Sequence, residues 1–367
     1  MRNQMMKIAF ITRSTLYTVP GGDTEQVLQT ARFLRLLGVE VDLRLTTENI
    51  DYSKYDLLHV FNITRPADLL YHIRKSKKPI VVSTILVDYT EYDKKHRKGL
   101  PGFVLNLFPK NSNEYIKTIG RWLLNKDSLQ TKSYIWKGQQ SSIREILRKT
   151  SWLLPNSKAE YFEVERLYGI KKNYTVVPNG IDDSLYSPLP GTTKDQRLVL
   201  SAARIEGRKN QLNLIRALND TNYTLLLTGL PAPNQAKYYS ECKKIASSNI
   251  IFCGRVPIET LISYYRKAKV HVLPSWHETC GLSSLEAAAM GCNIVVTDRG
   301  FTREYFGNDA FYCEPEDPAS IFDAVQRATA IESSQTLQQK ILSQYTWQQA
   351  AQKTLLAYQN ALSACRS

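Results

Sequence analysis

VHVLPSWHETCGLSSLEAAAMGCNIVVT, residues 270–297, has the pattern of a strand, a loop, a helix and a second strand. The apolar runs VHVLPS (270–275) and NIVVT (293–297) have the length and the β-branched content of buried strands. Helix-forming residues occupy 282–290 between them. Because two parallel strands need a long crossover, usually a helix, this stretch predicts a parallel sheet with helices on its faces.

The same alternation extends over most of the chain. In the second half, strands are predicted at 197–203, 223–229 and 250–254, and helices at 208–218, 233–246 and 258–268. In the first half, the predicted strands are 7–12, 39–45, 56–63, 79–86, 151–157 and 174–180, and the predicted helices are 24–37 and 66–76. This pattern predicts an α/β fold with two doubly wound, Rossmann-like domains that face each other across a cleft.

A polar stretch with proline and glycine, 182–196, is the best candidate for a linker between the domains. We therefore expect an N-terminal domain at 1–182, a linker at 183–196 and a C-terminal domain at 197–345. The remaining residues, 346–367, contain a predicted last helix at about 346–363.

Composition narrows the class of protein. The 367 residues contain no run of 18 or more apolar residues, which predicts that no segment crosses a membrane. The N-terminal residues lack the layout of a signal peptide. All six cysteines lie in the second half and none forms a C-x-x-C pair, so we expect reduced thiols and a cytoplasmic protein.

The formal charge of +14 is unevenly spread. Residues 94–149 hold 13 Lys/Arg and 3 Asp/Glu, a net +10, with aromatic and leucine residues between the charges. Such a segment suits an anionic membrane surface, and an ordinary solvated basic surface explains it equally well. Nucleic acid is the least favoured partner of the three, and we expect none.

The stretch HETCGLSSLE, 277–286, places Glu278 and Glu286 on either side of Gly281 at a predicted helix start. It follows a strand, and ligands in such sheets bind beyond the carboxyl ends of the strands. A glycine permits close approach of a ligand, and the N–H groups of a helix start favour a phosphate. The carboxylate of Glu286 suits the paired hydroxyls of a ribose. This layout matches a nucleotide sugar.

Other interpretations of the two acids are a solvated surface and a metal site. Acids are common in a first helical turn, where they complement the helix dipole. However, Glu286 opens the apolar run EAAAMGCNIVV, where a solvated acid is less expected. The five histidines are scattered and no D-x-D pattern occurs, so we expect no required metal or cofactor.

Arg204 and Lys209 lie around the turn that follows the predicted strand 197–203. A guanidinium and an ammonium there could neutralise a pyrophosphate and stabilise the charge that develops as it leaves. Taken singly, each residue is more simply a surface cation at a turn.

The first half has its own candidate in VPGGDTEQ, 19–26. Gly21 and Gly22 precede a helix for which Asp23 is the predicted N-cap. Two glycines let the backbone approach a ligand, although a plain turn is an equally good interpretation. The pattern is not G-x-G-x-x-G and gives no support to a nicotinamide cofactor.

Together these residues resemble the retaining glycosyltransferases of family 4, which have the GT-B fold. The resemblance covers nearly the whole chain and rests on five stretches: GGDTEQ (21–26), VVPNGID (176–182), ARIEGRKNQ (202–210), the region 252–291 and the helix at Trp347. It implies transfer of a sugar, with retention, from a UDP- or GDP-sugar whose base stays undetermined.

The resemblance also implies roles for individual residues. Glu278 would contact hydroxyls of the donor sugar, and Gly281 and Leu282 would offer backbone N–H groups. Glu286 would hold the ribose, and Arg204 and Lys209 would hold the pyrophosphate and act with Glu278 at the reacting bond. The remaining donor-side residues would be Arg255, Val256, whose backbone meets the base, and Cys280, which we interpret as a packing change.

On the acceptor side, Gly21 and Gly22 would approach the donor phosphate or the acceptor. Many relatives carry a histidine near the position of Ile85, where this chain has ILVDYTEYD. Asp88, Tyr89 or Glu91 is expected to line the acceptor side instead. The last helix would pack back on the N-terminal domain.

The expected acceptor is a glycan hydroxyl, including a lipid-linked or cell-envelope glycan at the inner face of a membrane. Two alternatives stay open. A nucleotide-sugar epimerase or hydrolase would share the fold, and a basic membrane or nucleic-acid binder would not be an enzyme.

Overall fold

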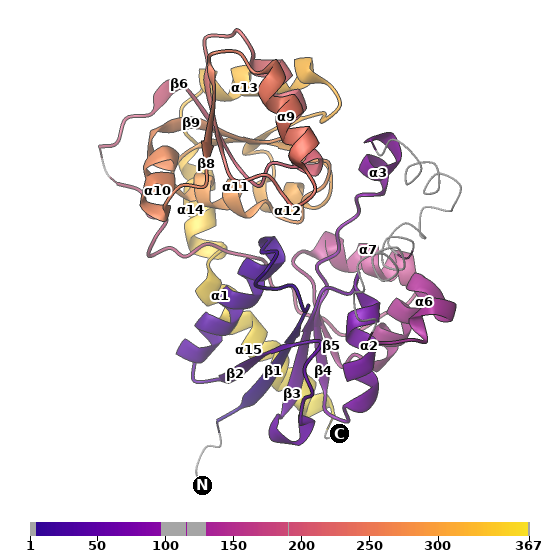
Figure 1. Cartoon of the computed structure of the whole chain (residues 1–367). Coiled ribbons are helices and arrows are strands. Elements are labelled where there is room, and N and C mark those ends of the chain that lie inside the picture. Colours follow the sequence, from indigo (N-terminus) through magenta and orange to yellow (C-terminus); the bar gives the residue numbers. More distant parts are fainter. Residues whose placement is uncertain (1–4, 97–114, 116–129, 190, 366–367) are drawn as a thin grey trace. The chain divides into compact units, whose positions relative to one another are not determined.

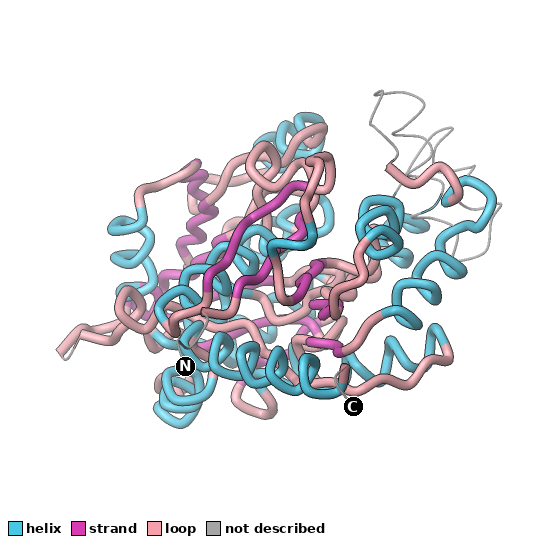
Figure 2. Tube along the Cα trace, turned by 90° about the horizontal axis from the view of Figure 1, so that it is seen from below, coloured by secondary structure: helices cyan, strands magenta, loops and turns pink. Residues whose placement is uncertain are grey.

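The computed structural model describes residues 5–96, 115, 130–189 and 191–365 of the chain, which forms two compact units (Figure 1). Unit 1 comprises Met1–Asn179 and Trp347–Ser367, and unit 2 comprises Gly180–Thr346. Figure 2 shows strands alternating with helices along the trace, as expected for parallel sheets joined by crossover helices. The basic segment at 94–149 lies largely outside the described residues.

Unit 1 contains a parallel sheet of five strands in the order β2-β1-β3-β4-β5. The strands are β1 Lys7–Thr12, β2 Glu40–Leu45, β3 Leu57–Phe61, β4 Ile80–Ser83 and β5 Trp152–Leu154. The α-helices described in this unit are α1 Gly22–Leu36, α2 Pro66–Lys75, α3 Thr90–His96, α6 Tyr134–Lys149, α7 Lys158–Tyr168 and α15 Trp347–Ala364. From β1 the chain passes to β2 on one side of the sheet, and from β3 it passes to β4 and β5 on the other side. Because the crossovers between parallel strands are right-handed, these two directions place helices on both faces of the sheet.

The C-terminal helix α15 packs against α1 and belongs to unit 1. The buried ring of His59 on β3 holds it to the sheet, because Nδ1 lies 2.6 Å from Tyr358 Oη of α15. The other ring nitrogen, Nε2, lies 2.8 Å from Ser83 Oγ on β4. The expected return of the last helix to the N-terminal domain is confirmed by these contacts.

Unit 2 contains a parallel sheet of six strands in the order β11-β10-β9-β6-β7-β8. The strands are β6 Asp195–Ala202, β7 Thr224–Thr228, β8 Ile250–Gly254, β9 Ala268–Leu273, β10 Asn293–Thr297 and β11 Ala310–Cys313. The helices are α8 Gln211–Leu218, α9 Ala236–Ile245, α10 Ile258–Lys267, α11 Leu282–Ala289, α12 Thr302–Phe306, α13 Pro318–Ala330 and α14 Gln335–Gln344. Two apolar clusters fill the two faces of this sheet.

The two sheets and their helices confirm the predicted α/β fold class, but several predicted elements were wrong. The strand expected at 174–180 is reduced to an isolated bridge between Tyr174 and Leu153, and Pro178 within it has no N–H to donate to a ladder. The helix expected at 208–218 is split by Asn210, whose φ of 62° separates a 3₁₀ turn at Gly207–Lys209 from α8. Six elements were not predicted as separate elements: α3, α7, α12, β11, α13 and α14.

Two buried histidines predict acid sensitivity. Burial lowers the pKa of His59 in unit 1 and of His271 in unit 2 to about 3. An unfolded histidine titrates near 6.5, so below that pH the unfolded chain binds protons that the folded chain refuses. The contribution of each neutral, buried histidine to the free energy of unfolding is therefore fully present above pH 6.5. It is lost progressively as the pH falls from 6.5 toward 3.

We expect the free energy of unfolding in urea to drop by ~1 kcal/mol per histidine between pH 7 and pH 5.5. A His59→Gln variant should lose its share of this pH dependence while keeping a polar partner for Tyr358. A pH profile of the variant that is as steep as that of the wild type would contradict the assignment.

Candidate functional site

In unit 2, the predicted donor-side residues follow the carboxyl ends of three strands. Arg204 comes two residues after β6, Glu278 follows β9, and Arg255 comes directly after β8. These strands are parallel, so all three loops lie at one edge of the sheet, where ligands bind in this class of fold.

The structure brings Lys209 and Glu278 together in an ion pair, although 69 residues separate them in sequence. Lys209 Nζ donates to Glu278 Oε1, and the two side chains are 19% and 10% exposed. An ion pair this sheltered from solvent is stronger than a surface pair, because water screens it less. It holds the carboxylate of Glu278 in one place.

Hydrogen bonds from neighbouring loops hold the turn that carries Lys209. Asn210 adopts the left-handed conformation, and its side-chain Nδ2 donates to Pro274 O at 3.1 Å and to Pro315 O at 2.6 Å. Trp276 N also donates to Arg208 O at 3.0 Å. These bonds tie the 3₁₀ turn to the loop after β9, and they explain why the predicted helix is interrupted here.

Gly300, which the sequence analysis missed, supports the backbone of Glu278 from the loop after β10. Glu278 N donates to Arg299 O at 3.1 Å, and Phe301 N donates to Glu278 O at 2.9 Å. Gly300 has φ +95°, and a Cβ there would lie 2.1 Å from Glu278 O. Only glycine fits such a position. The one available signal was a glycine three residues after the predicted strand 293–297.

Gly281 and Leu282 form the start of α11. Gly281 is the N-cap residue with φ 70° and ψ 74°, a conformation that glycine adopts readily. Leu282 is the first helical residue, so its N–H is among those that a helix start leaves without an intrahelical acceptor. Cys280, just before, is buried in the apolar core, as its interpretation as a packing residue requires.

Glu286 lies in the second turn of α11 and is half-buried. Tyr265 Oη, from the end of α10, donates to Glu286 Oε2 at 2.9 Å. Tyr265 is fully buried, and burial followed by the charge of Glu286 raises its pKa well above the usual range. The phenol therefore stays protonated and orients this carboxylate. The sequence analysis did not find Tyr265.

The other donor-side candidates are more exposed. Arg204 donates through Nη2 to Glu206 Oε1 at 3.1 Å and its side chain is 41% exposed. Arg255 is exposed and Val256 is half-buried at the end of β8. None of the described residues form a group of three or more His, Cys, Asp or Glu that could hold a metal ion.

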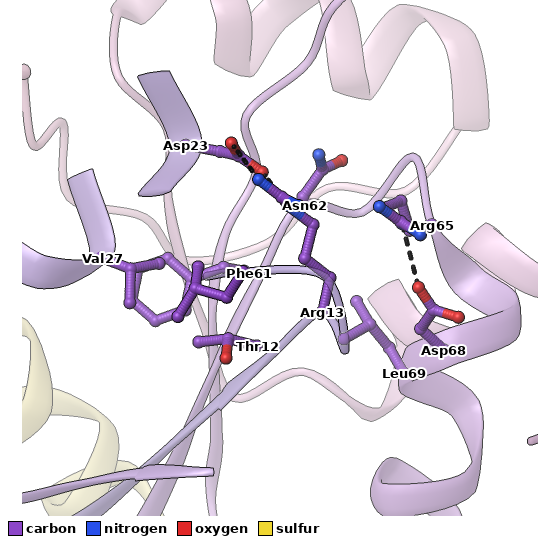
Figure 3. A pocket seen from close by; sticks show the side chains of 10 residues that line it. Thr12, Arg13, Asp23, Val27, Phe61, Asn62, Arg65, Asp68 and Leu69 are labelled. Carbon is purple, nitrogen blue, oxygen red and sulfur yellow. Dashed lines mark hydrogen bonds and ion pairs between the residues drawn. The ribbon is translucent and has the colours of Figure 1, made fainter. Parts of the chain in front are cut away.

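In unit 1, Arg13 organises the loop that leads to Gly21 and Gly22. Its guanidinium makes two bonds to the carboxylate of Asp23, at 2.7 and 3.0 Å, and further bonds to Thr15 O and Val19 O. Figure 3 shows Arg13 bonded to Asp23 in the lining of a narrow pocket at the carboxyl ends of β1 and β3.

The N-cap prediction at Asp23 is therefore corrected. The residue before the helix is Gly21, whose N–H donates to Thr24 Oγ1 at 3.1 Å. Asp23 lies one residue inside α1 and serves as the partner of Arg13.

Ile85 has φ 45°, which is strained for a β-branched residue. The buried carboxylate of Glu160 holds this turn, because it accepts from Thr84 Oγ1 and, at 2.7 Å, from Leu86 N. Its other oxygen accepts from Asn156 N at 2.8 Å. Sequence reasoning did not single out Glu160, which reads locally as an acid in a first helical turn.

The two acids proposed for the acceptor side have local contacts. Asp88 Oδ1 accepts from Thr90 N at 2.8 Å at the start of α3, and Glu91 pairs with Lys95 at 3.0 Å. Asp88 is exposed, and the Glu91 side chain is 41% exposed. Both follow the strained turn at Ile85.

Comparison with known proteins identifies sequence similarity over about half of the chain. Residues 187–345 match the family model "Glycosyl transferases group 1". A D-inositol 3-phosphate glycosyltransferase of Acidothermus cellulolyticus is 24% identical over 208 residues, which cover 50% of this chain and 46% of that protein. A glycogen synthase of Mycobacterium tuberculosis is 26% identical over 231 residues, covering 58% and 55%. The chain thus spans about half the length of the curated relatives it matches.

Solved structures share the fold over nearly the full length. A sucrose-phosphate synthase from Thermosynechococcus elongatus superposes with a TM-score of 0.75 at 16% identity, covering 98% of this chain and 100% of that one. Anabaena Alr3699/HepE, solved in complex with UDP and glucose, gives a TM-score of 0.63 at 16% identity, covering 99% and 100%. At this level of identity the likeness establishes the fold, which is that of the GT-B glycosyltransferases.

Proposed function

We propose that the chain, whose residues 187–345 match the model of the glycosyl transferases group 1 family, transfers a sugar from a nucleotide-sugar donor to an acceptor hydroxyl. The configuration at the anomeric carbon is retained. The proposal is carried by one observation, the sheltered pair of Lys209 and Glu278 beside the glycine turn at Gly281.

The donor lies along the carboxyl edge of the unit 2 sheet. The ribose hydroxyls bind Glu286, whose carboxylate Tyr265 holds in place. The pyrophosphate passes over Gly281, where the absent side chain leaves room and the helix start offers N–H groups. The sugar hydroxyls reach Glu278. The relative solved with UDP and UDP-glucose supports a nucleotide sugar as donor.

The roles proposed for Lys209 and Arg204 follow from the negative charge that develops on the leaving group during sugar transfer. As the bond between the anomeric carbon and the leaving oxygen breaks, negative charge builds on the nucleoside diphosphate, and Lys209 and Arg204 stabilise it. The acceptor hydroxyl forms the new bond on the same face and passes its proton to the leaving phosphate oxygen. No protein base is needed for this step. Because Lys209 engages Glu278, we assign Glu278 to sugar binding rather than to nucleophilic attack.

A thermal-shift series with UDP, GDP and ADP tests the donor site. At about 100 times its Kd, the correct nucleotide should stabilise the folded chain by about 2.7 kcal/mol, and the others should have far smaller effects. Stabilisation by none of the three at millimolar concentration would contradict the proposed site. Donor consumption that needs no acceptor would instead indicate a hydrolase or an epimerase.

We further propose an acceptor presented at an anionic membrane surface, such as a lipid-linked glycan. No helix among the described residues is both long and apolar enough to cross a bilayer. Within the basic segment, the described helix α6 carries Trp136, which is 76% exposed. Interfacial tryptophans and basic residues favour such surfaces.

We expect the protein to sediment with vesicles that contain about 30% anionic lipid at low salt, and to be released as the salt concentration rises. Trp136→Ser should weaken binding to the vesicles. Trp152→Ser, a substitution on strand β5, is the control and should leave vesicle binding unchanged. Failure to bind at low salt would remove the membrane from the proposal and leave sugar transfer unaffected.

A further inference from the structure

A second pocket of unit 2, about 530 Å³ in volume, lies away from the donor-side loops. Its walls include Lys194 just before β6, Arg266 just before β9 and Gly291 just before β10. These strands are parallel, so the pocket opens at their amino ends. Glu278 and Arg204 follow the carboxyl ends of the same sheet. The pocket is therefore a separate site at the opposite edge.

Arg266 is the unusual side chain of this pocket. Its Nε is buried, yet it has no hydrogen-bond partner among the described residues. The guanidinium also forms no ion pair with a described carboxylate. A buried, charged N–H group without an acceptor is costly, and a guanidinium presents its donors in a fork that matches phosphate and carboxylate oxygens. The pocket thus contains a cation that lacks its anion.

Two lysines add positive charge around Arg266. Lys194 Nζ donates to Tyr265 O and Met290 O, each at 2.8 Å, which holds the ammonium at the pocket wall. Lys269 is 1% exposed and its Nζ lies 3.7 Å from Glu332 Oε2. Burial lowers the pKa of Lys194, so Arg266 supplies the most persistent charge.

The acidic side chain of the pocket wall, Glu332, does not neutralise this charge well. Its side chain is 97% exposed, and the one described cation that it reaches is Lys269, near the distance limit of an ion pair. Hydroxyl and amide groups of Thr193, Ser333 and Gln338 complete the wall. Such groups suit the hydroxyls of a polyol or sugar.

We propose that this pocket binds a small phosphate-bearing molecule, with Arg266 as the principal contact of the phosphate. The volume lies within the range of small-molecule sites and exceeds what a bare phosphate needs, which favours a phosphate ester such as a sugar phosphate. The site is independent of the donor site. Its ligand would touch Thr193 and Lys194, in the segment that leads into β6.

Calorimetric titrations of the full chain test the proposal, with a hexose monophosphate and inorganic phosphate as separate probes at equal ionic strength. We expect saturable binding with about one site per chain. Tighter binding of the hexose monophosphate identifies an ester as the ligand, and equal affinities identify free phosphate. Because phosphate could also enter the donor site, a Lys209→Ala chain should bind the probe as the wild type does.

Arg266→Gln should weaken binding at least about tenfold. The matched control is Lys267→Gln, which removes an exposed neighbouring charge outside the pocket and should change affinity less than about twofold. Glu332→Gln alters an exposed side chain and should tighten binding, so the test stands even if Arg266→Gln fails to fold. Absence of saturable binding, or unchanged affinity in both Arg266→Gln and Glu332→Gln, would overturn the proposal.

Discussion

Replacing Lys209 with alanine should lower the rate of sugar transfer by about 10²–10³-fold, the usual cost of losing one preorganised donor at a developing charge. The loss should appear mainly in kcat at saturating donor, because the ammonium matters most as the leaving group departs. By contrast, Glu286→Ala should act mainly on the donor KM, since the ribose is bound equally in ground and transition states. Initial rates over a range of donor concentrations separate the two.

Loss of Lys209 also leaves Glu278 as a poorly exposed carboxylate without this partner. Part of the effect could then come from a disturbed loop, and a double variant distinguishes the two causes. Glu278→Gln combined with Lys209→Ala should recover thermal stability, because no unpaired charge remains, but it should not recover activity. Turnover like that of the wild type in Lys209→Ala, with donor and acceptor saturating, would refute the site.

Gly300→Ala should destabilise unit 2 by about 2–4 kcal/mol and sharply reduce activity. The added methyl group would meet the carbonyl oxygen of Glu278 at 2.1 Å, and φ +95° is strained for alanine. The loop that carries Glu278 must move to relieve the clash. Melting temperature and donor affinity report the two consequences.

Gly169→Ala is the control for this substitution. Gly169, at the end of α7, has the left-handed conformation with φ 67° and ψ 26°, and nothing lies within 4 Å of its added Cβ. It should cost only about 1 kcal/mol, from backbone conformation alone, and leave activity near normal. If the two variants were equally stable and equally active, the contact between Gly300 and Glu278 would have no role in positioning the loop.

The sequence allowed prediction of the fold class but not of the contacts between loops that position Glu278. The alternation of strands and helices is a local pattern, so the fold class could be predicted, together with the edge of the sheet where Glu278 and Arg204 lie. The contact between Glu278 and Gly300 depends on β9 and β10 being neighbours in register, which no local pattern contains. The pairing of Lys209 with Glu278 likewise bridges two loops and could only be seen in the fold.

Errors in the element predictions have similar causes. The stretch at 174–180 has the apolar content of a strand, but its proline prevents a continuous ladder. Asn210 lies within a sequence pattern that is typical of a helix. Its side chain donates hydrogen bonds to two carbonyl groups distant in sequence, and the helix is interrupted there. Glu160 and Tyr265 were missed because a buried polar side chain is recognised only when its partners are known.

The return of α15 to unit 1 has a consequence for how the protein is made. During synthesis, residues 1–179 emerge first, but the helix that covers His59 emerges only after all of unit 2. Until then, the buried site that Tyr358 fills is open, and the face that α15 covers on α1 is exposed. Unit 1 can therefore complete its fold only after α15 has been synthesised. Nascent chains truncated before Trp347 should therefore expose unit 1 to proteases and to chaperones.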